Sequence, residues 1–223
     1  FKLTISEKGI DPEKIEVVKN GANLSLFQPQ VKDKSILRKH NLENKIILGY
    51  IGTHGMAHNL GFILDCAKKV IDNQKIHFLF IGDGAEKENL KRKVSDEKIT
   101  NVTMLPSVSK DEIKDYISIL DISIINLKKS ALFKTVIPSK IFENAAMEIP
   151  ILIGVDGEAR SIIEKYNAGL FFQPEDTDSF LEEFNNILIP DNYKKYKSGC
   201  KSLALAYDRK KLAKKMLDII AKI

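Results

Sequence analysis

Short apolar runs alternate with amphipathic stretches from residue 45 to residue 173. The apolar runs are continuous and end at glycine or at polar residues, whereas a strand exposed on one face would alternate apolar and polar positions. Continuous runs of this length are typical of strands buried on both faces of a parallel sheet. They predict six strands, at residues 45–52, 75–82, 102–105, 120–127, 149–155 and 168–173.

The stretches between these runs have the spacing of helices. In residues 59–73, for example, Leu60, Ile63, Leu64 and Ala67 would share one helical face. Ser109 and Glu112 match a capping box, and Asp208 suits the N-cap of the last helix. Helices are predicted at 59–73, 85–95, 110–117, from 138 onward, 158–166, 177–189, 193–207 and 208–223. Strands that alternate with helices indicate an α/β fold, a doubly wound, Rossmann-like parallel sheet of six strands.

The first 44 residues lack this alternation. Residues 15–19 are predicted to be one short strand, followed by the Asn20-Gly21 turn and a helix at 34–40. We therefore divide the chain into a lead-in segment that packs on the sheet (1–44), a main lobe (45–190) and C-terminal helices (191–223).

Composition narrows the class of protein. A net charge of +5 and the lack of tryptophan do not suggest a nucleic-acid-binding protein. Cys66 and Cys200 match no metal-ligand spacing and no disulfide framework, so we expect no metal site and a reducing, cytoplasmic compartment. Lysines cluster at 194–201 and 210–215. These clusters could be solvated helix faces, or they could form a patch that binds anionic lipid headgroups. No run is long enough for a transmembrane helix and no signal peptide is visible. Because the chain begins with Phe1, we expect a processed or excised chain.

The loops that follow the predicted strands hold the candidate chemistry, because ligands bind at the carboxyl ends of parallel strands. Gly52 and Gly55 would let the backbone approach a ligand, with Thr53 and His54 between them. His54 could donate a hydrogen bond to a phosphate or a sugar hydroxyl, or it could be a loop residue bonded to the backbone. Other candidates at strand ends are Gly82, Gly84 and Val108, the last where backbone groups could contact a base. No GxGxxG pattern is present, which is evidence against a dehydrogenase.

The stretch 133–153 contains the most informative pattern. Pro138 suits the first turn of a helix, where Ser139 and Lys140 would meet an anion. Glu143 falls on the same face as Lys140. Phosphates on the helix start and ribose hydroxyls on the carboxylate would suit a nucleoside diphosphate. The alternative is a capped amphipathic helix with a surface Lys–Glu pair. Lys134, in the long basic loop before this helix, is a second candidate for neutralising phosphate.

These loops, in this order, resemble the C-terminal, donor-binding lobe of a GT-B glycosyltransferase of the family 4 type. The resemblance covers nearly the whole chain and is strongest for bacterial enzymes that build surface polysaccharides from nucleotide-activated amino sugars. Besides 133–143 and the Thr53-His54-Gly55 loop, it rests on residues 16–29, 80–84, 150–153, 168–170 and 174–176. The family has two glutamates eight positions apart. The second matches Glu143, which the resemblance assigns to the ribose hydroxyls, and the first is replaced by Thr135, which would contact the sugar. The family's basic residues after the first strand are missing here. The resemblance therefore assigns catalytic charge to Lys140, Lys134 and His54.

The resemblance further implies transfer of a sugar from a nucleoside diphosphate, with uridine as the expected base, with retention of configuration and without metal or cofactor. The acceptor would be a glycan or a lipid-linked sugar at the inner face of the plasma membrane. The acceptor lobe would precede Phe1, so this chain alone should bind donor without transferring it. A non-catalytic nucleotide-sugar-binding or regulatory module, and a nucleotide-sugar epimerase or hydrolase, remain as alternatives.

Overall fold

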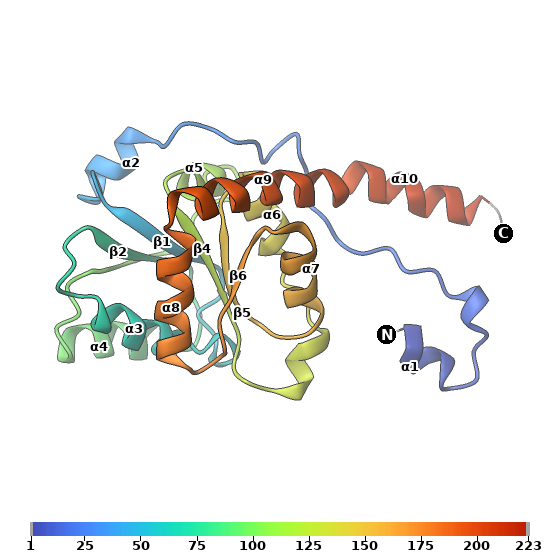
Figure 1. The fold of residues 1–223 in the computed structure, drawn as a ribbon, viewed down its shortest axis with the longest axis horizontal. Helices are drawn as coiled ribbons and strands as arrows, with labels where there is room; N and C mark the ends of the chain where they lie inside the picture. Colours follow the sequence, from blue (N-terminus) through green and yellow to red (C-terminus); the bar gives the residue numbers. More distant parts are fainter. Residues whose placement is uncertain (1, 222–223) are drawn as a thin grey trace.

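A parallel sheet of six strands forms the centre of the structure, a computed structural model that describes residues 2–221. The strand order is β3-β2-β1-β4-β5-β6, and every neighbouring pair is parallel (Figure 1). The order reverses between β1 and β4, which places the switch point of a doubly wound sheet there. The predicted α/β architecture and all six strands are confirmed: β1 (Ile46–Ile51), β2 (Ile76–Ile81), β3 (Val102–Leu105), β4 (Ile122–Asn126), β5 (Ile151–Gly154) and β6 (Gly169–Phe171).

Helices cover both faces of this sheet, because successive strand residues point to opposite sides. One core cluster contains Leu48 and Phe80 with side chains of α3, α4 and α8, and the other contains Ile47 and Leu79 with side chains of α5, α6, α7 and α9. The described helices are α1 (Lys2–Ser6), α2 (Lys34–Lys39), α3 (Leu60–Lys69), α4 (Lys87–Asp96), α5 (Ile113–Ser118), α6 (Lys140–Ala146), α7 (Glu158–Tyr166), α8 (Thr177–Ile187), α9 (Pro190–Ala206) and α10 (Arg209–Ile220), with the 3-10 turns η1 (Pro12–Lys14), η2 (Met56–His58) and η3 (Ala131–Thr135).

The hydrogen bonds of both predicted caps are present, although α5 begins only at Ile113, with Glu112 at its N-cap. The Ser109 Oγ accepts a hydrogen bond from the Glu112 amide at 3.3 Å, while the Glu112 carboxylate accepts one from the Ser109 amide at 3.2 Å. The Asp208 carboxylate accepts a hydrogen bond from the Lys210 amide at 3.0 Å. The predicted end of the last helix at Ile223, like Phe1, lies outside the described residues.

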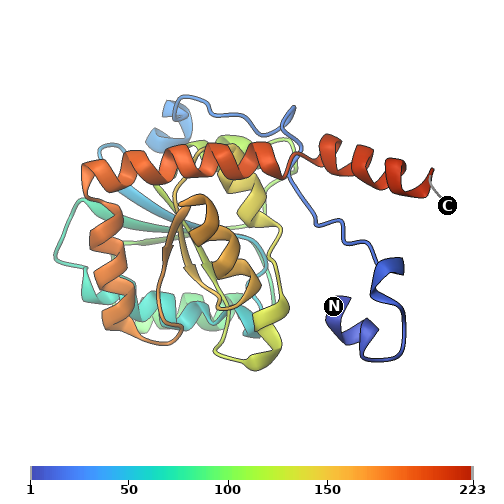
Figure 2. The ribbon, with the colours of Figure 1, turned by 45° about the vertical axis from the view of Figure 1, so that its right-hand side comes forward.

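The N-terminal segment differs from the expectation. Residues 15–19 do not form a strand. Within the described chain, the only bridge of this segment joins Ala22 to Asp208, so no neighbouring strand supplies ladder partners for 15–19. Further along, Ala22, Phe27, Ile36 and Leu42 are buried in the same core cluster as α6 and α9. The part around α1 and η1 projects away from the sheet beside α10 (Figures 1 and 2).

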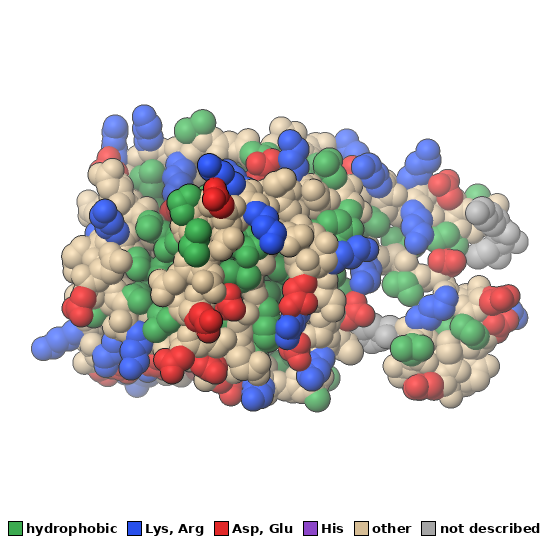
Figure 3. All heavy atoms as spheres, in the orientation of Figure 1, with side chains coloured by type: hydrophobic (Ala, Val, Ile, Leu, Met, Phe, Trp, Pro, Cys, Tyr) green, Lys and Arg blue, Asp and Glu red, His purple; other side chains and the backbone are tan. Residues whose placement is uncertain are grey.

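The two lysine clusters lie on exposed surface of α9 and α10, where Figure 3 shows basic side chains along one edge of the molecule. α10 has no buried residue, and Met216, Leu217 and Ile220 are exposed on it. None of the helices within residues 2–221 combines the length and apolar character needed to cross a bilayer.

The core cluster that contains Leu48 and Phe80 is centred on a set of aromatic rings. Phe180 of α8 lies 5.1 Å from Phe172 and 6.4 Å from both Phe62 and Phe78, between ring centroids. Its side chain is fully buried. These contacts connect α8, α3 and β2, elements that are far apart in the sequence.

Phe180→Ala should therefore lower the free energy of unfolding by about 3–5 kcal/mol, because it leaves a cavity among packed rings. Urea denaturation followed by circular dichroism measures this change. Leu205→Ala, at a half-exposed position of α9, is the control and should change stability by no more than about 0.5 kcal/mol. Equal, small effects of both substitutions would contradict this view of the core.

Candidate functional site

Three loops meet at the carboxyl ends of β1, β2 and β3. Backbone hydrogen bonds join them: the Gly52 amide donates to Ile81 O at 2.8 Å, the His54 amide to Asp83 O at 2.8 Å, and the Gly82 amide to Leu105 O at 3.3 Å. Together they surround a hollow of about 230 Å³, beside the switch point of the sheet. Its lining includes the predicted Gly52, Thr53, Gly82 and Val108, together with Asp83 and Ser107.

Two of the predicted glycines are required by the close approach of these loops. Gly82 has a φ of +147°, and a Cβ there would lie 1.8 Å from the carbonyl oxygen of Gly52. A Cβ on Gly84 would lie 2.5 Å from the carbonyl oxygen of His54. The sequence predicts Gly82 and Gly84 as candidates at a strand end, and the structure shows that they let two loops approach each other.

Lys140 reaches this place from the other side of the switch point. It is the first residue of α6, and its Nζ lies 3.9 Å from the centre of the Tyr50 ring. The same Nζ lies 2.7 Å from where a Cβ on Gly52 would stand. Tyr50 is held in turn by its hydroxyl, which donates to Thr53 O at 2.8 Å. A cation from α6 is therefore brought to the backbone that lines the hollow.

Burial shifts the pKa values of two side chains on α6. The pKa of Lys140 is lowered to about 8, because burial disfavours the ammonium more than the Glu143 carboxylate favours it. The pKa of Glu143 is raised by burial, against the opposing effects of Arg209 and Lys140. The charged lysine is thus poorly compensated by the protein itself. A bound anion would supply the missing compensation.

Arg209 is a neighbour that the sequence analysis did not find. Its Nη2 donates to Gly21 O at 2.8 Å, which ties the start of α10 to the lead-in segment. The same guanidinium opposes the rise that burial causes in the pKa of Glu143. No sequence pattern connects positions 143 and 209, because their proximity follows from the packing of α9 on α6.

The structure places His54 behind the hollow. Its side chain is 0% exposed, between the rings of Tyr50 and Phe80 at 6.0 and 6.4 Å. Burial, and next the Lys87 cation, lower its pKa to about 4, so the ring is neutral at pH 7. Within residues 2–221, neither ring nitrogen has a hydrogen-bond partner. The expected alternative of a ring bonded to the backbone is therefore not observed, and contact with a ligand would require the loop to move.

Lys134 is separated from Lys140 in space, although only five positions lie between them in the sequence. Its ammonium pairs with Asp156 at 3.4 Å and lines a second hollow of about 300 Å³, with Phe133 and Pro174. The two hollows share no lining residue. The predicted pair of lysines is thus divided between two places on the carboxyl side of the sheet.

The remaining candidates lie around α6 and η2. Thr135 ends η3 and is exposed, with its hydroxyl 3.4 Å from Leu132 O. Pro138 precedes the helix and its carbonyl accepts from the Ile141 amide at 3.1 Å, while Ser139 is exposed and makes no side-chain capping bond. Gly55 is the N-cap of η2 and lines a different hollow, beside Met56. Among residues 2–221, no group of three or more His, Cys, Asp or Glu side chains is placed to hold a metal ion.

Comparison with known proteins identifies the kind of fold and family. The family model described as "Glycosyl transferases group 1" matches residues 32–198. TuaH of Bacillus subtilis, named for teichuronic acid biosynthesis, is 25% identical over 198 residues, covering 88% of this chain and 48% of that protein. The Escherichia coli UDP-Gal:alpha-D-GlcNAc-diphosphoundecaprenol alpha-1,3-galactosyltransferase is 23% identical over 186 residues, covering 81% of this chain and 46% of that protein. The chain thus spans about half the length of the curated relatives it matches.

A solved structure shares the whole described architecture. Anabaena Alr3699/HepE, crystallised with UDP, superposes with a TM-score of 0.85 at 13% identity, covering 100% of this chain and 61% of that chain. At this identity the likeness concerns the fold.

The lowered pKa of Lys140 gives a test by pH. Between about pH 8 and pH 10.5 the unfolded chain holds a proton that the folded chain has released, so folding becomes more favourable as the pH rises through this window. The free energy of unfolding of the wild type, relative to Lys140→Met, should rise by about 1–3 kcal/mol across it. Urea denaturation at a series of pH values measures the difference. Lys214→Met, at an exposed position of α10, is the control. The assignment would be contradicted if the difference in free energy of unfolding between the wild type and Lys140→Met stayed constant over this pH window.

Proposed function

Since the chain belongs to the group 1 glycosyl transferases, we propose that it is the part of a glycosyltransferase that binds the donor, a nucleoside diphosphate sugar. The observation that carries this proposal is the meeting of Lys140 with the glycine loop of β1 at the switch point of the sheet. Open α/β sheets bind nucleotides at this position. A lysine whose ammonium is partly desolvated gains most from a multiply charged anion such as a diphosphate.

The roles we propose for the other residues follow from their positions. Glu143 is half-buried on the same helix as Lys140 and would accept hydrogen bonds from the ribose hydroxyls. The hollow lined by Gly82, Ser107 and Val108 would take the base. The structural likeness to a protein crystallised with UDP supports uridine as that base.

We propose that the reaction proceeds with retention of configuration. Negative charge grows on the departing diphosphate in the transition state, and fixed cations and backbone N–H groups stabilise such charge. Lys140 and the N–H groups at the start of α6 would supply that stabilisation without a metal ion. Thr135 would contact the sugar through its hydroxyl. The predicted catalytic roles of Lys134 and His54 remain hypotheses.

The proposal also concerns the acceptor of the transferred sugar. The names of the two relatives concern teichuronic acid and a diphosphoundecaprenol-linked sugar. They support a glycan or lipid-linked acceptor in surface polysaccharide synthesis, used at the cytoplasmic face of the membrane. Because the chain spans about half of these relatives, we propose that a further lobe binds the acceptor. The 223-residue chain alone should then bind donor with little or no transfer.

A nucleotide-sugar epimerase is less well supported by the site. Its chemistry would need acidic and histidine side chains that face the sugar. His54 is fully buried with its ring directed among Tyr50 and Phe80. A transferase, which acts mainly by stabilising a leaving group, needs no such side chain in this half.

Glu143→Ala tests the site. Wild-type chain saturated with UDP at about 100 times its dissociation constant should gain about 2.7 kcal/mol of stability. The substitution should raise the dissociation constant about tenfold or more, because hydrogen bonds to a charged group are lost. Isothermal titration calorimetry with UDP, and a thermal-shift series with UDP, ADP and GDP, measure both effects.

Glu182→Ala, at an exposed position of α8, is the matched control and should bind UDP like the wild type. A wild-type chain that binds none of the three nucleotides would refute the proposed function. Equal affinity of wild type and Glu143→Ala would remove only the ribose assignment.

A further inference from the structure

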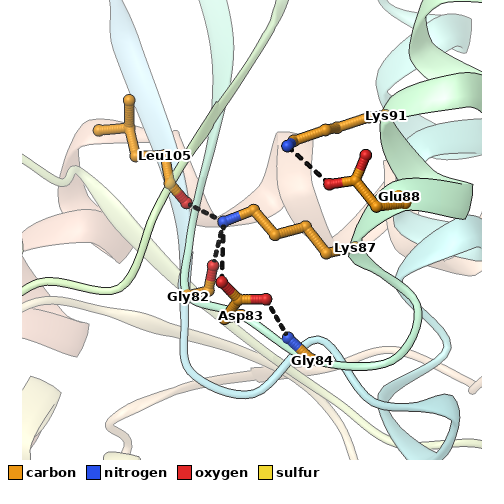
Figure 4. Close-up of polar contacts among 7 residues, drawn as sticks. All are labelled: Gly82, Asp83, Gly84, Lys87, Glu88, Lys91 and Leu105. Carbon is orange, nitrogen blue, oxygen red and sulfur yellow. Dashed lines mark hydrogen bonds and ion pairs between the residues drawn. The ribbon is translucent and has the colours of Figure 1, made fainter.

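Lys87 is a buried lysine without a role in the site described so far. It is the first residue of α4, and only 6% of its surface is exposed. Its Nζ donates hydrogen bonds to Gly82 O at 2.5 Å and to Leu105 O at 3.0 Å, and Asp83 Oδ2 lies 3.9 Å away (Figure 4). A buried ammonium is costly unless acceptors surround it. Here the acceptors all come from two loops of the candidate site.

These two acceptors lie on neighbouring strand ends. Gly82 follows β2, and Leu105 is the last residue of β3. Leu105 O also accepts from the Gly82 amide at 3.3 Å, a long bond that lies at the end of the ladder between the two strands. The ammonium therefore joins the β2 and β3 loops just where their regular pairing stops. Beyond this point each loop contributes to the lining of the hollow, with Asp83 from one and Val108 from the other.

The start of α4 also holds the loop after β1. The Glu86 amide donates to His54 O at 2.9 Å, and the Lys87 amide donates to Gly84 O at 3.0 Å. The Gly84 amide donates to Asp83 Oδ1 at 2.8 Å, which turns the Asp83 carboxylate toward the same point. The start of α4 thus contacts the loops after β1 and β2 and the last residue of β3.

Lys91, one turn further along α4, shows what an ordinary lysine of this helix does. It pairs with Glu88 at 2.8 Å on exposed surface, and within the described residues its ammonium forms no hydrogen bond or ion pair with the three loops (Figure 4). Exposed pairs of this kind contribute little to stability. The two lysines therefore share a helix and a charge but differ in burial and in their acceptors.

We propose that Lys87 is a positioning residue that fixes the wall of the nucleotide pocket formed by the loops after β2 and β3, and thereby sets which base the pocket accepts. This inference rests on the proposed function, since it concerns the same hollow. The ammonium would not touch the ligand. It acts through the carbonyl groups of Gly82 and Leu105, which it holds at a fixed separation. The backbone at Ser107 and Val108 is then held at a fixed distance from a bound base.

Lys87→Met tests the inference, with Lys91→Met as matched control, because both remove one ammonium from α4 and leave a side chain of similar length. Dissociation constants for UDP, ADP and GDP are measured by calorimetry on the complete 223-residue chain. Lys87→Met should weaken binding of the preferred nucleotide about tenfold or more and reduce its preference over the other two. Lys91→Met should change each constant by less than about twofold.

A second measurement separates positioning from general stability. Amide hydrogen exchange should become faster at residues 82–84 and 105–108 in Lys87→Met, while the strands β1 and β4 keep their protection. If Lys87→Met does not fold, Lys87→Gln and Lys87→Arg replace it. The arginine keeps a cation with several donors, so its nucleotide preference should be closer to that of the wild type than the preference of the glutamine variant.

Two results would overturn the inference. One is a folded Lys87→Met, or a folded pair of Arg and Gln variants, with unchanged preference among the three nucleotides. The other is an equal weakening of all three nucleotides together with a uniform loss of protection across the sheet, since this would show a role in stability alone. A wild-type chain that binds no nucleotide would instead refute the proposed function.

Discussion

The close approach of the loop after β1 to the loop after β2 is the constraint on which the site depends. The Gly52 carbonyl oxygen occupies space that any Cβ on Gly82 would need, 1.8 Å away. Because these backbones touch, the carboxyl edge of the sheet has a continuous surface of main chain and not a row of separate loops. Lys140 meets this surface on one side, at Gly52, and Lys87 supports it from behind, at Gly82. A ligand placed there would face backbone groups and one poorly compensated cation.

Three polar side chains around this surface, the buried Lys87 and His54 and the half-buried Lys140, are stabilised to different degrees, and the differences suggest their functions. Lys87 has backbone acceptors from two loops, so its charge is compensated within the protein. Lys140 has an aromatic face and a half-buried carboxylate nearby, and its pKa is lowered to about 8. His54 has no partner for either ring nitrogen and avoids the cost of charge by staying neutral. Of the three, Lys140 is the cation whose charge the protein compensates least, so it is the group best suited to bind an anion.

The sequence predicted the strands well and the lead-in segment poorly, for one physical reason. Continuous apolar runs are typical of buried parallel strands, and each of the six predicted strands pairs with at least one neighbour in the sheet. Residues 15–19 contain three β-branched residues but also a glutamate and a lysine, and no neighbouring strand lies beside them in the described chain. The same limit applies to the lysines. Lys134 and Lys140 are close in sequence, but Lys134 lies in η3 and pairs with Asp156, whereas Lys140 begins α6 and lies beside Gly52.

The sequence by itself determined the α/β class, the order of strands and helices, and the positions of the chemically distinctive loops. It did so because hydrophobic periodicity, caps and glycine-containing strand ends are local properties of the chain. Only the tertiary structure decided which of these groups meet. The contact of Lys140 with Gly52, the influence of Arg209 on Glu143 and the two carbonyls held by Lys87 all join residues from different elements. Such contacts follow from the strand order and from helix packing across the sheet, which no local pattern encodes.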